Sequence, residues 1–170
     1  MQALLLTHTI LIPSVYGPPV VLPCGFNRLA HRLFELIRDD PNQQRDRTKI
    51  VCHPVLVQVA QAKAQDMLDR DYYTHVDPDG HGADWLVQQA GYELPGSYGT
   101  GLSTNYIESI AKNTPTAERV FMRFLASPPH RRHLLGETSH FREQTCFGVG
   151  FSGTYPTSAL YWCVISTPPV

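Results

Sequence analysis

Three polar side chains, far apart in the chain of 170 residues, are of the types that bind metal ions or transfer protons. They are His75, Glu108 and His130. Two neutral imidazoles and a carboxylate suit a borderline metal ion such as zinc. The same groups can also move protons, with Glu108 orienting or accepting and a histidine donating. Taken singly, each is also an ordinary loop, strand or helix-start residue, so the chemistry depends on whether the fold brings them together.

Standard catalytic motifs are missing from the sequence. It contains no H-E-x-x-H, no G-x-S-x-G and no phosphate-binding P-loop, so any site must be assembled from dispersed residues. Ser109 is next to Glu108, but neighbouring strand residues point to opposite faces and should not cooperate. A Cys–His enzyme would need Cys52 or Cys146 near a cleft histidine. Cys52 and His75 flank one long predicted helix and lie about 25 Å or more apart, which argues against that pair.

The elements that must position these residues follow from apolar spacing and from turn residues. Helices are predicted over residues 27–38, 54–70 and 83–90, after Thr114-Pro115, and from Ser127-Pro128 to Gly136. Strands are predicted over residues 106–111, 145–152 and 160–167, the last two forming a hairpin. Asp77 and Asp79 belong to a Pro-Asp-Gly turn that follows the long helix. This order predicts an α+β fold with helices packed on a small, mostly antiparallel sheet.

Composition excludes some classes of partner. Lys and Arg number 14 and Asp and Glu number 15, so there is no excess positive charge to neutralise nucleic acid. The apolar stretch in residues 3–12 is shorter than a membrane span, and we expect no integral membrane protein. Residues 1–25 contain an apolar stretch like that of a signal peptide, but no basic residue precedes Arg28, as a signal peptide requires. We therefore interpret them as a degraded or truncated signal-like segment. One folded domain is therefore predicted over residues 26–170, in a secreted protein.

The four cysteines are Cys24, Cys52, Cys146 and Cys163, and they contain no C-x-x-C pair. Four cysteines allow three pairings, among which the sequence alone does not choose. Cys146 and Cys163 lie in the two strands of the predicted hairpin, so a bond between them is one hypothesis. The alternative is that both are small buried apolar residues.

Several segments, in this order and spacing, resemble the bacterial branch of the CAP superfamily, which includes cysteine-rich secretory proteins, antigen 5 and plant pathogenesis-related proteins and is also called SCP-like. The matching segments run from about residue 27 to the C-terminus and read AQAKAQDM, YYTHVDPDG, AGY, IESIA, SPPHRRHLL, FGVGF and YW. The resemblance implies a three-layer α-β-α sandwich. It also implies a central cleft lined by His75, Glu108 and His130, with the two histidines similar to a pair that binds divalent metal in several members.

Two departures from the family pattern concern this cleft. The usual Gly-Glu-Asn-Ile is here Ile107-Glu108-Ser109-Ile110, which removes the amide beside the carboxylate. The usual Trp six residues before the second histidine is Phe124, which has no N–H donor.

Three functions remain open from the sequence. The first is a secreted binding domain whose cleft holds zinc or another divalent metal and a small or lipid-like ligand. The second is a metal-dependent hydrolase with Glu108 as general base. The third is a non-catalytic structural or interaction domain, since fold does not imply function.

Overall fold

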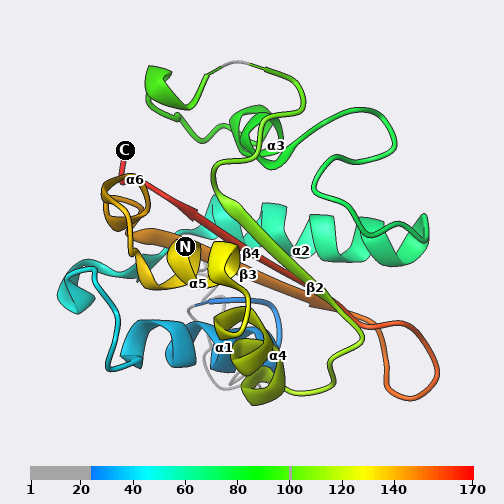
Figure 1. Ribbon diagram of the computed structural model, residues 1–170. Helices are drawn as coiled ribbons and strands as arrows, with labels where there is room; N and C mark the ends of the chain where they lie inside the picture. Colours follow the sequence, from blue (N-terminus) through cyan, green and yellow to red (C-terminus); the bar gives the residue numbers. More distant parts are fainter. Residues whose placement is uncertain (1–23, 100) are drawn as a thin grey trace, which may run out of the picture.

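The computed structural model describes residues 24–99 and 101–170, so the signal-like assignment of residues 1–23 lies outside the described residues. The described chain forms helices and strands in the order α1 (Arg28–Asp39), β1 (Val51–Cys52), α2 (Pro54–Asp69), α3 (Ala83–Gln89), β2 (Glu108–Lys112), α4 (Ala117–Leu125), α5 (Pro128–Leu135), α6 (Ser139–Arg142), β3 (Cys146–Ser152) and β4 (Tyr161–Thr167). Short 3₁₀ turns form at Arg47–Lys49 and Gly96–Tyr98. The predicted α+β class is confirmed (Figure 1).

The four strands form one sheet in the order β1-β3-β4-β2. Strands β3 and β4 make the predicted antiparallel hairpin, and β2 pairs antiparallel with β4. The two-residue strand β1 pairs parallel with β3 and is too short to give an alternating pattern in the sequence. Glu108 therefore begins a strand at the open edge of the sheet.

Helices cover both faces of this sheet, as in a three-layer sandwich (Figure 1). On one face, α2 and α3 pack on Ile110 of β2 and on Cys163 and Ile165 of β4. On the other face, α1 and α4 pack on Trp162 and Val164, the alternate residues of β4. Strand residues that alternate between the faces thus contribute to two separate apolar cores.

Two glycines let α2 lie directly on the sheet. A Cβ atom at Gly148 would overlap the backbone of Leu56, and one at Gly150 would overlap the backbone of Ala60. Both glycines lie on the α2 face of β3, whereas Phe147 and Val149, which alternate with them along the strand, face α1. The sequence FGVGF thus combines one bulky face and one bare face in a single strand.

Helix ends largely follow the sequence signals. The Asn27 side chain accepts the backbone N–H of Ala30 at 2.9 Å, and Pro54 opens α2. Gly136 closes α5 in the left-handed conformation at φ 66°. The fourth helix begins at Ala117 instead of directly at Thr114-Pro115, because the Thr116 side chain caps it by accepting the N–H of Arg119. Within the described residues, no helix combines the length and the apolar character that a membrane crossing needs.

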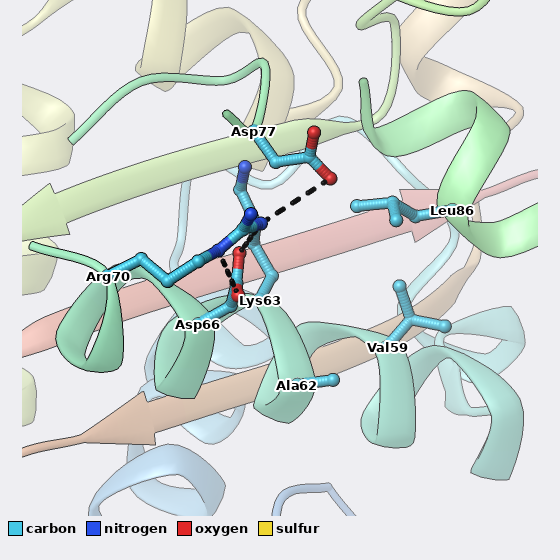
Figure 2. Close-up of a pocket in the computed structure, with 7 residues that line it drawn as sticks. All are labelled: Val59, Ala62, Lys63, Asp66, Arg70, Asp77 and Leu86. Atoms are coloured by element: carbon cyan, nitrogen blue, oxygen red, sulfur yellow. Dashed lines mark hydrogen bonds and ion pairs between the residues drawn. The ribbon is translucent and has the colours of Figure 1, made fainter. Parts of the chain in front are cut away.

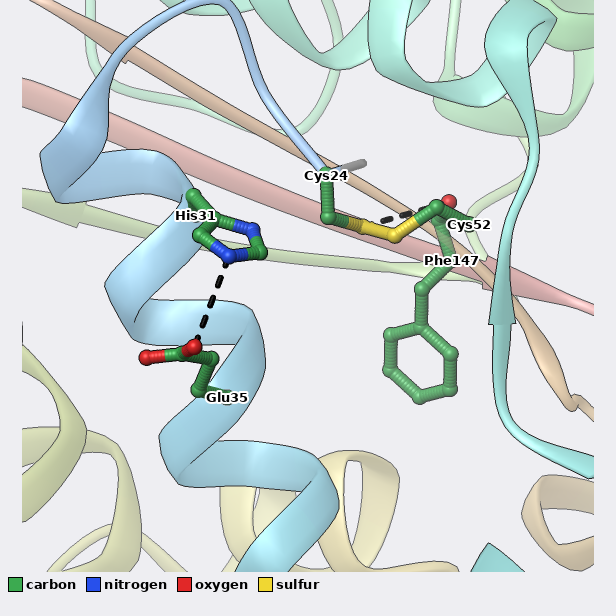
Figure 3. The surroundings of a disulfide bond; sticks show 5 residues. All are labelled: Cys24, His31, Glu35, Cys52 and Phe147. Carbon is green, nitrogen blue, oxygen red and sulfur yellow. Dashed lines mark hydrogen bonds and ion pairs between the residues drawn. A yellow bond between two sulfur atoms is a disulfide. The ribbon is translucent and has the colours of Figure 1, made fainter. Parts of the chain in front are cut away.

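The hypothesis of a Cys146–Cys163 bond was wrong. The strand register places Cys163 opposite Gly150 and Cys146 opposite Thr167, so the two cysteines are separated along the ladder and both remain free and buried. The disulfide instead joins Cys24 to Cys52, which fastens the segment before α1 to β1 (Figure 3). Cys24 is fully buried and belongs to the core beneath α1.

A chain of buried polar groups holds α5 to the sheet. His133 lies between the hydroxyls of Ser109 on β2, 2.7 Å from Nδ1, and Ser166 on β4, 2.8 Å from Nε2. The Gln144 amide nitrogen donates to the carbonyl of Tyr106, so its Oε1 accepts from Ser166 at 2.8 Å. Ser166 must then accept from Nε2–H of His133, and Nδ1 accepts from Ser109. The network therefore uses His133 as a neutral ring with its proton on Nε2.

We expect His133 to make the fold sensitive to acid. Burial, followed by repulsion from Arg45 and other histidines, holds its pKa well below the usual range. The unfolded chain protonates this residue below about pH 6.5 and the folded chain does not, so stability falls with falling pH by up to about 1.4 kcal/mol per pH unit. Urea unfolding of wild type and His133→Gln at pH 7 and pH 5 measures this. The wild type should lose about 1–2 kcal/mol more than the variant, and equal losses would contradict the assignment.

The disulfide closes a loop with a sequence separation of 28 residues, and its loss should destabilise the protein by about 3–4 kcal/mol. Thermal unfolding with and without reductant tests this. The Cys24→Ser/Cys52→Ser double variant should unfold at the same temperature as the reduced wild type, and reductant should leave it unchanged. If the unfolding temperature of the wild type stays the same in reductant while Cys24 and Cys52 are shown to be reduced, the disulfide has no stabilising role.

Candidate functional site

Glu108 is the centre of the candidate site. It starts the edge strand β2, opposite Ile165 of β4, on the face that α2 covers. Its side chain is completely buried, although it carries an ionisable carboxyl group. A buried carboxylate is tolerated only where its oxygens are hydrogen-bonded, so its partners determine what the site can do.

Both carboxylate oxygens of Glu108 are engaged. Oε1 lies 2.8 Å from Nδ1 of His75, and the Cys163 thiol lies 3.4 Å from Oε2, to which it donates. The backbone N–H of Glu108 donates to the Asn105 side chain at 3.0 Å. Because an ionised carboxylate only accepts, Nδ1 of His75 carries a proton, and Nε2 is the nitrogen that offers a lone pair when the ring is neutral. The predicted His75 and Glu108 are thus brought together.

His75 lies in the loop between α2 and α3, and that loop is fastened to α2. Lys63 donates from Nζ to the carbonyl of His75 at 3.1 Å.

Arg70 holds the later part of this loop, with Nη1 2.6 Å from Asp79 and Nη2 2.7 Å from Asp66 on α2. Oδ1 of Asp77 accepts the backbone N–H groups of Asp79 and His81, as its place in a turn predicts. The loop is therefore a built support that aims His75 at β2.

The edge of β2 that pairs with no other strand is covered by the elements that carry the candidate site residues. The Tyr73 hydroxyl donates to the carbonyl of Ile110 at 3.2 Å, and Arg123 of α4 donates to the carbonyl of Lys112 at 2.7 Å. These bonds occupy backbone groups that an unprotected edge would offer to another chain. They also bring the loop before α3 and the helical layer of α4 to the same strand.

His130 approaches from the opposite helical layer. It lies in the first turn of α5, is half-buried, and packs on the ring of Phe124 with centroids 5.2 Å apart. Burial lowers its pKa, and repulsion from His75 and from Arg123 lowers it further. The environment of His130 thus favours a neutral imidazole.

The two sequence departures have separate consequences. Phe124 keeps an aromatic surface against His130 without a hydrogen bond. Ser109 faces away from Glu108, as strand alternation predicts, and hydrogen-bonds to His133 on the other side of the sheet. Its pairing with His133 is buried, so neither side chain is open to a substrate.

Sequence reasoning missed the residues that support the site. Cys163 and Asn105 give no local signal, because their roles depend on strand pairing and on a loop that returns to Glu108. His133 follows His130 by three positions in SPPHRRHLL, and helical spacing alone can suggest that both side chains lie on one side of α5. Lys63 fits the apolar stripe of α2 by position but carries a buried ammonium group.

The donor set suits two histidine ligands rather than three ligands. Among residues 24–99 and 101–170, no group of three or more His, Cys, Asp or Glu side chains is arranged to hold a metal ion. The free Nε2 of His75 and the neutral imidazole of His130 are each suited to ligation. Glu108 has its oxygens committed to His75 and Cys163, an arrangement in which a carboxylate orients a ligating histidine.

Comparison with known proteins assigns the fold to a family. The model of the family "CAP: Cysteine-rich secretory protein family" matches residues 31–165. The chain belongs to the CAP family. The match includes His75, Glu108 and His130, and the observed sandwich agrees with the architecture that the resemblance implied.

Two solved structures resemble this CAP chain. An outer surface protein from Borrelia burgdorferi superposes with a TM-score of 0.58 at 18% identity, covering 81% of this chain and 90% of that one. An extracellular protein containing an SCP domain from Bacillus anthracis gives a TM-score of 0.48 at 22% identity, covering 67% of this chain and 32% of that one. A search of curated proteins finds no match. At this level of identity, the first likeness supports the fold.

If His75 and His130 share one site, removal of His75 should raise the pKa of His130. The value should stay below the usual range, because burial against Phe124 remains. NMR titration of the histidine ring protons in wild type and His75→Ala measures the shift. His81→Ala is the matched control from the same loop and should leave the pKa of His130 unchanged. If the pKa of His130 is unchanged in His75→Ala, the two histidines do not share one site.

Proposed function

We propose that this CAP domain is a secreted binding protein in which His75 and His130 hold a divalent metal, best matched by zinc, beside a site for a small or lipid-like ligand. Glu108 is assigned to orienting His75. The observation that carries the proposal is the 2.8 Å contact between His75 Nδ1 and the fully buried Glu108 carboxylate. It fixes the ring and leaves Nε2 as the ligating atom.

Exposure and charge support the assignment of the two histidines. The His75 side chain is 41% exposed, so an ion from solvent can reach it without opening the core. His130 is half-buried with a lowered pKa, which keeps it unprotonated at neutral pH. A metal held there supplies positive charge to an anionic or polar ligand. Water or ligand atoms complete its coordination, since two imidazoles leave positions free.

Binding is favoured over hydrolysis by the burial of Glu108. A general base must lie within hydrogen-bond reach of the proton it removes. The Glu108 side chain has no exposed surface, and His75 and Cys163 occupy its two oxygens. It is therefore suited to holding a histidine rather than to activating water.

The Cys24–Cys52 disulfide supports a location outside the cytoplasm. Structural disulfides persist in oxidising compartments and are rare in the reducing cytosol. This bond is part of the core beneath α1 and ties the start of the described chain to the sheet.

Zinc titration by isothermal calorimetry at pH 7 tests the site. His75→Ala and His130→Ala should each abolish or strongly weaken binding, because each removes one of two ligands. Glu108→Gln should weaken binding by about tenfold to a hundredfold, as expected for an orienting group. Wild-type affinity should fall between pH 7 and pH 5 as the histidines protonate.

His81→Ala and His140→Ala are the matched controls, since they remove other partly exposed histidines and should retain wild-type affinity. Equal zinc affinity in wild type, His75→Ala and His130→Ala would contradict the proposed zinc site. A loss in Glu108→Gln as large as in the histidine variants would make Glu108 a direct ligand.

A further inference from the structure

A cleft of about 360 Å³ lies between α2, the loop that follows it, and α3, separate from the histidine pair. Its lining comes from Val59, Ala62, Lys63, Asp66, Arg70, Asp77 and Leu86. Figure 2 shows the charged side chains gathered at one end and the apolar ones at the other. Such a cleft suits a small ligand with a charged head and an apolar side.

Lys63 brings a cation into this cleft without a matching anion. The residue is only 2% exposed, and Nζ donates to the His75 carbonyl and lies 4.8 Å from the centre of the Tyr72 ring. In the part of the chain that the structure describes, no carboxylate oxygen lies within 4.0 Å of Nζ. An ammonium group has three donors, so one N–H remains for a ligand. A buried charge without a counter-ion is costly, and an anionic ligand group would offset that cost.

Asp77 brings to the same end a carboxylate oxygen that is held only by long ion pairs in the described part of the chain. Its side chain is 7% exposed, and Oδ1 accepts the two backbone N–H groups of the turn. Oδ2 makes two longer ion pairs, with Arg70 at 3.9 Å and with His81 at 3.5 Å, and accepts no hydrogen bond from the residues that the structure describes. Asp66, by contrast, is fully used, because Arg70 binds both of its oxygens at 2.7 Å. Within the described residues, the cleft therefore offers an ammonium group with no carboxylate within 4.0 Å and a carboxylate oxygen that accepts no hydrogen bond.

The opposite end of the cleft is apolar. Val59 and Ala62 of α2 face it from one side and Leu86 of α3 from the other (Figure 2). The lining carries two cations and two carboxylates and is neutral overall. A ligand with a net charge would therefore add an uncompensated charge to the cleft. A ligand with both charges on its head preserves the balance.

We propose that this cleft binds a free α-amino acid with an aliphatic side chain. The ligand carboxylate accepts from Lys63, its ammonium group donates to Oδ2 of Asp77, and its side chain packs against Val59, Ala62 and Leu86. A peptide terminus carries only one of these two charges and is therefore the poorer ligand.

The first test uses the unmodified protein labelled with ¹⁵N at pH 7 and four probes. L-leucine should shift the backbone amide signals of Ala62, Lys63 and Leu86. L-leucinamide lacks the carboxylate and 4-methylpentanoate lacks the ammonium group. Each should bind at least about tenfold more weakly than L-leucine. Glycine lacks the side chain and should also bind weakly. Absence of shifts with L-leucine, or equal affinity for L-leucine and L-leucinamide, would overturn the proposal.

The second test pairs each probe with the protein charge it needs. Lys63→Met should weaken L-leucine binding by about tenfold or more while leaving L-leucinamide unaffected. Asp77→Asn keeps the oxygen that accepts the turn N–H groups and should weaken L-leucine while leaving 4-methylpentanoate unaffected. Wild-type affinity for L-leucine in both variants would refute the assigned roles. Zinc binding at His75 and His130 is measured separately, so failure of either site leaves the other testable.

Discussion

The contact between the buried carboxylate of Glu108 and His75 is the interaction on which the proposed histidine site depends. The carboxylate lies at the start of an edge strand, with no exposed surface, and its two oxygens are held by His75 and Cys163. A carboxylate in this position is stable only with both partners in place. The same contact that satisfies Glu108 therefore fixes the ring of His75 and determines which nitrogen faces outward.

The edge position of β2 allows segments from two opposite helical layers to contribute to the proposed histidine site. An inner strand is covered on each side by a neighbouring strand, whereas β2 pairs only with β4. The loop that carries His75 reaches this edge from the α2 layer, and α5, which carries His130 in its first turn, lies in the other layer. Tyr73 and Arg123 bond to carbonyls on the same edge, so covering the strand and building the site use the same segments.

Close packing of α2 on β3 sets the position of both proposed sites. Gly148 and Gly150 remove the side chains that would hold α2 away from the sheet. Lys63 of this helix then bonds to the His75 carbonyl on one side and lines the cleft with Asp77 on the other. The histidine site and the cleft therefore share one helix and one loop, although they use different side chains.

The sequence by itself determined the α+β class, most helix ends, the β3–β4 hairpin and the opposite orientation of Glu108 and Ser109, because these follow from local spacing, capping residues and strand alternation. The family resemblance, rather than any local pattern, pointed to His75, Glu108 and His130 as one cleft. Only the tertiary structure decided the Cys24–Cys52 pairing, the contact of the Cys163 thiol with Glu108 and the bond from the Lys63 ammonium to the His75 carbonyl. Each of these depends on strand register and on contacts between segments distant in the chain, and no local preference of the residues themselves specifies them.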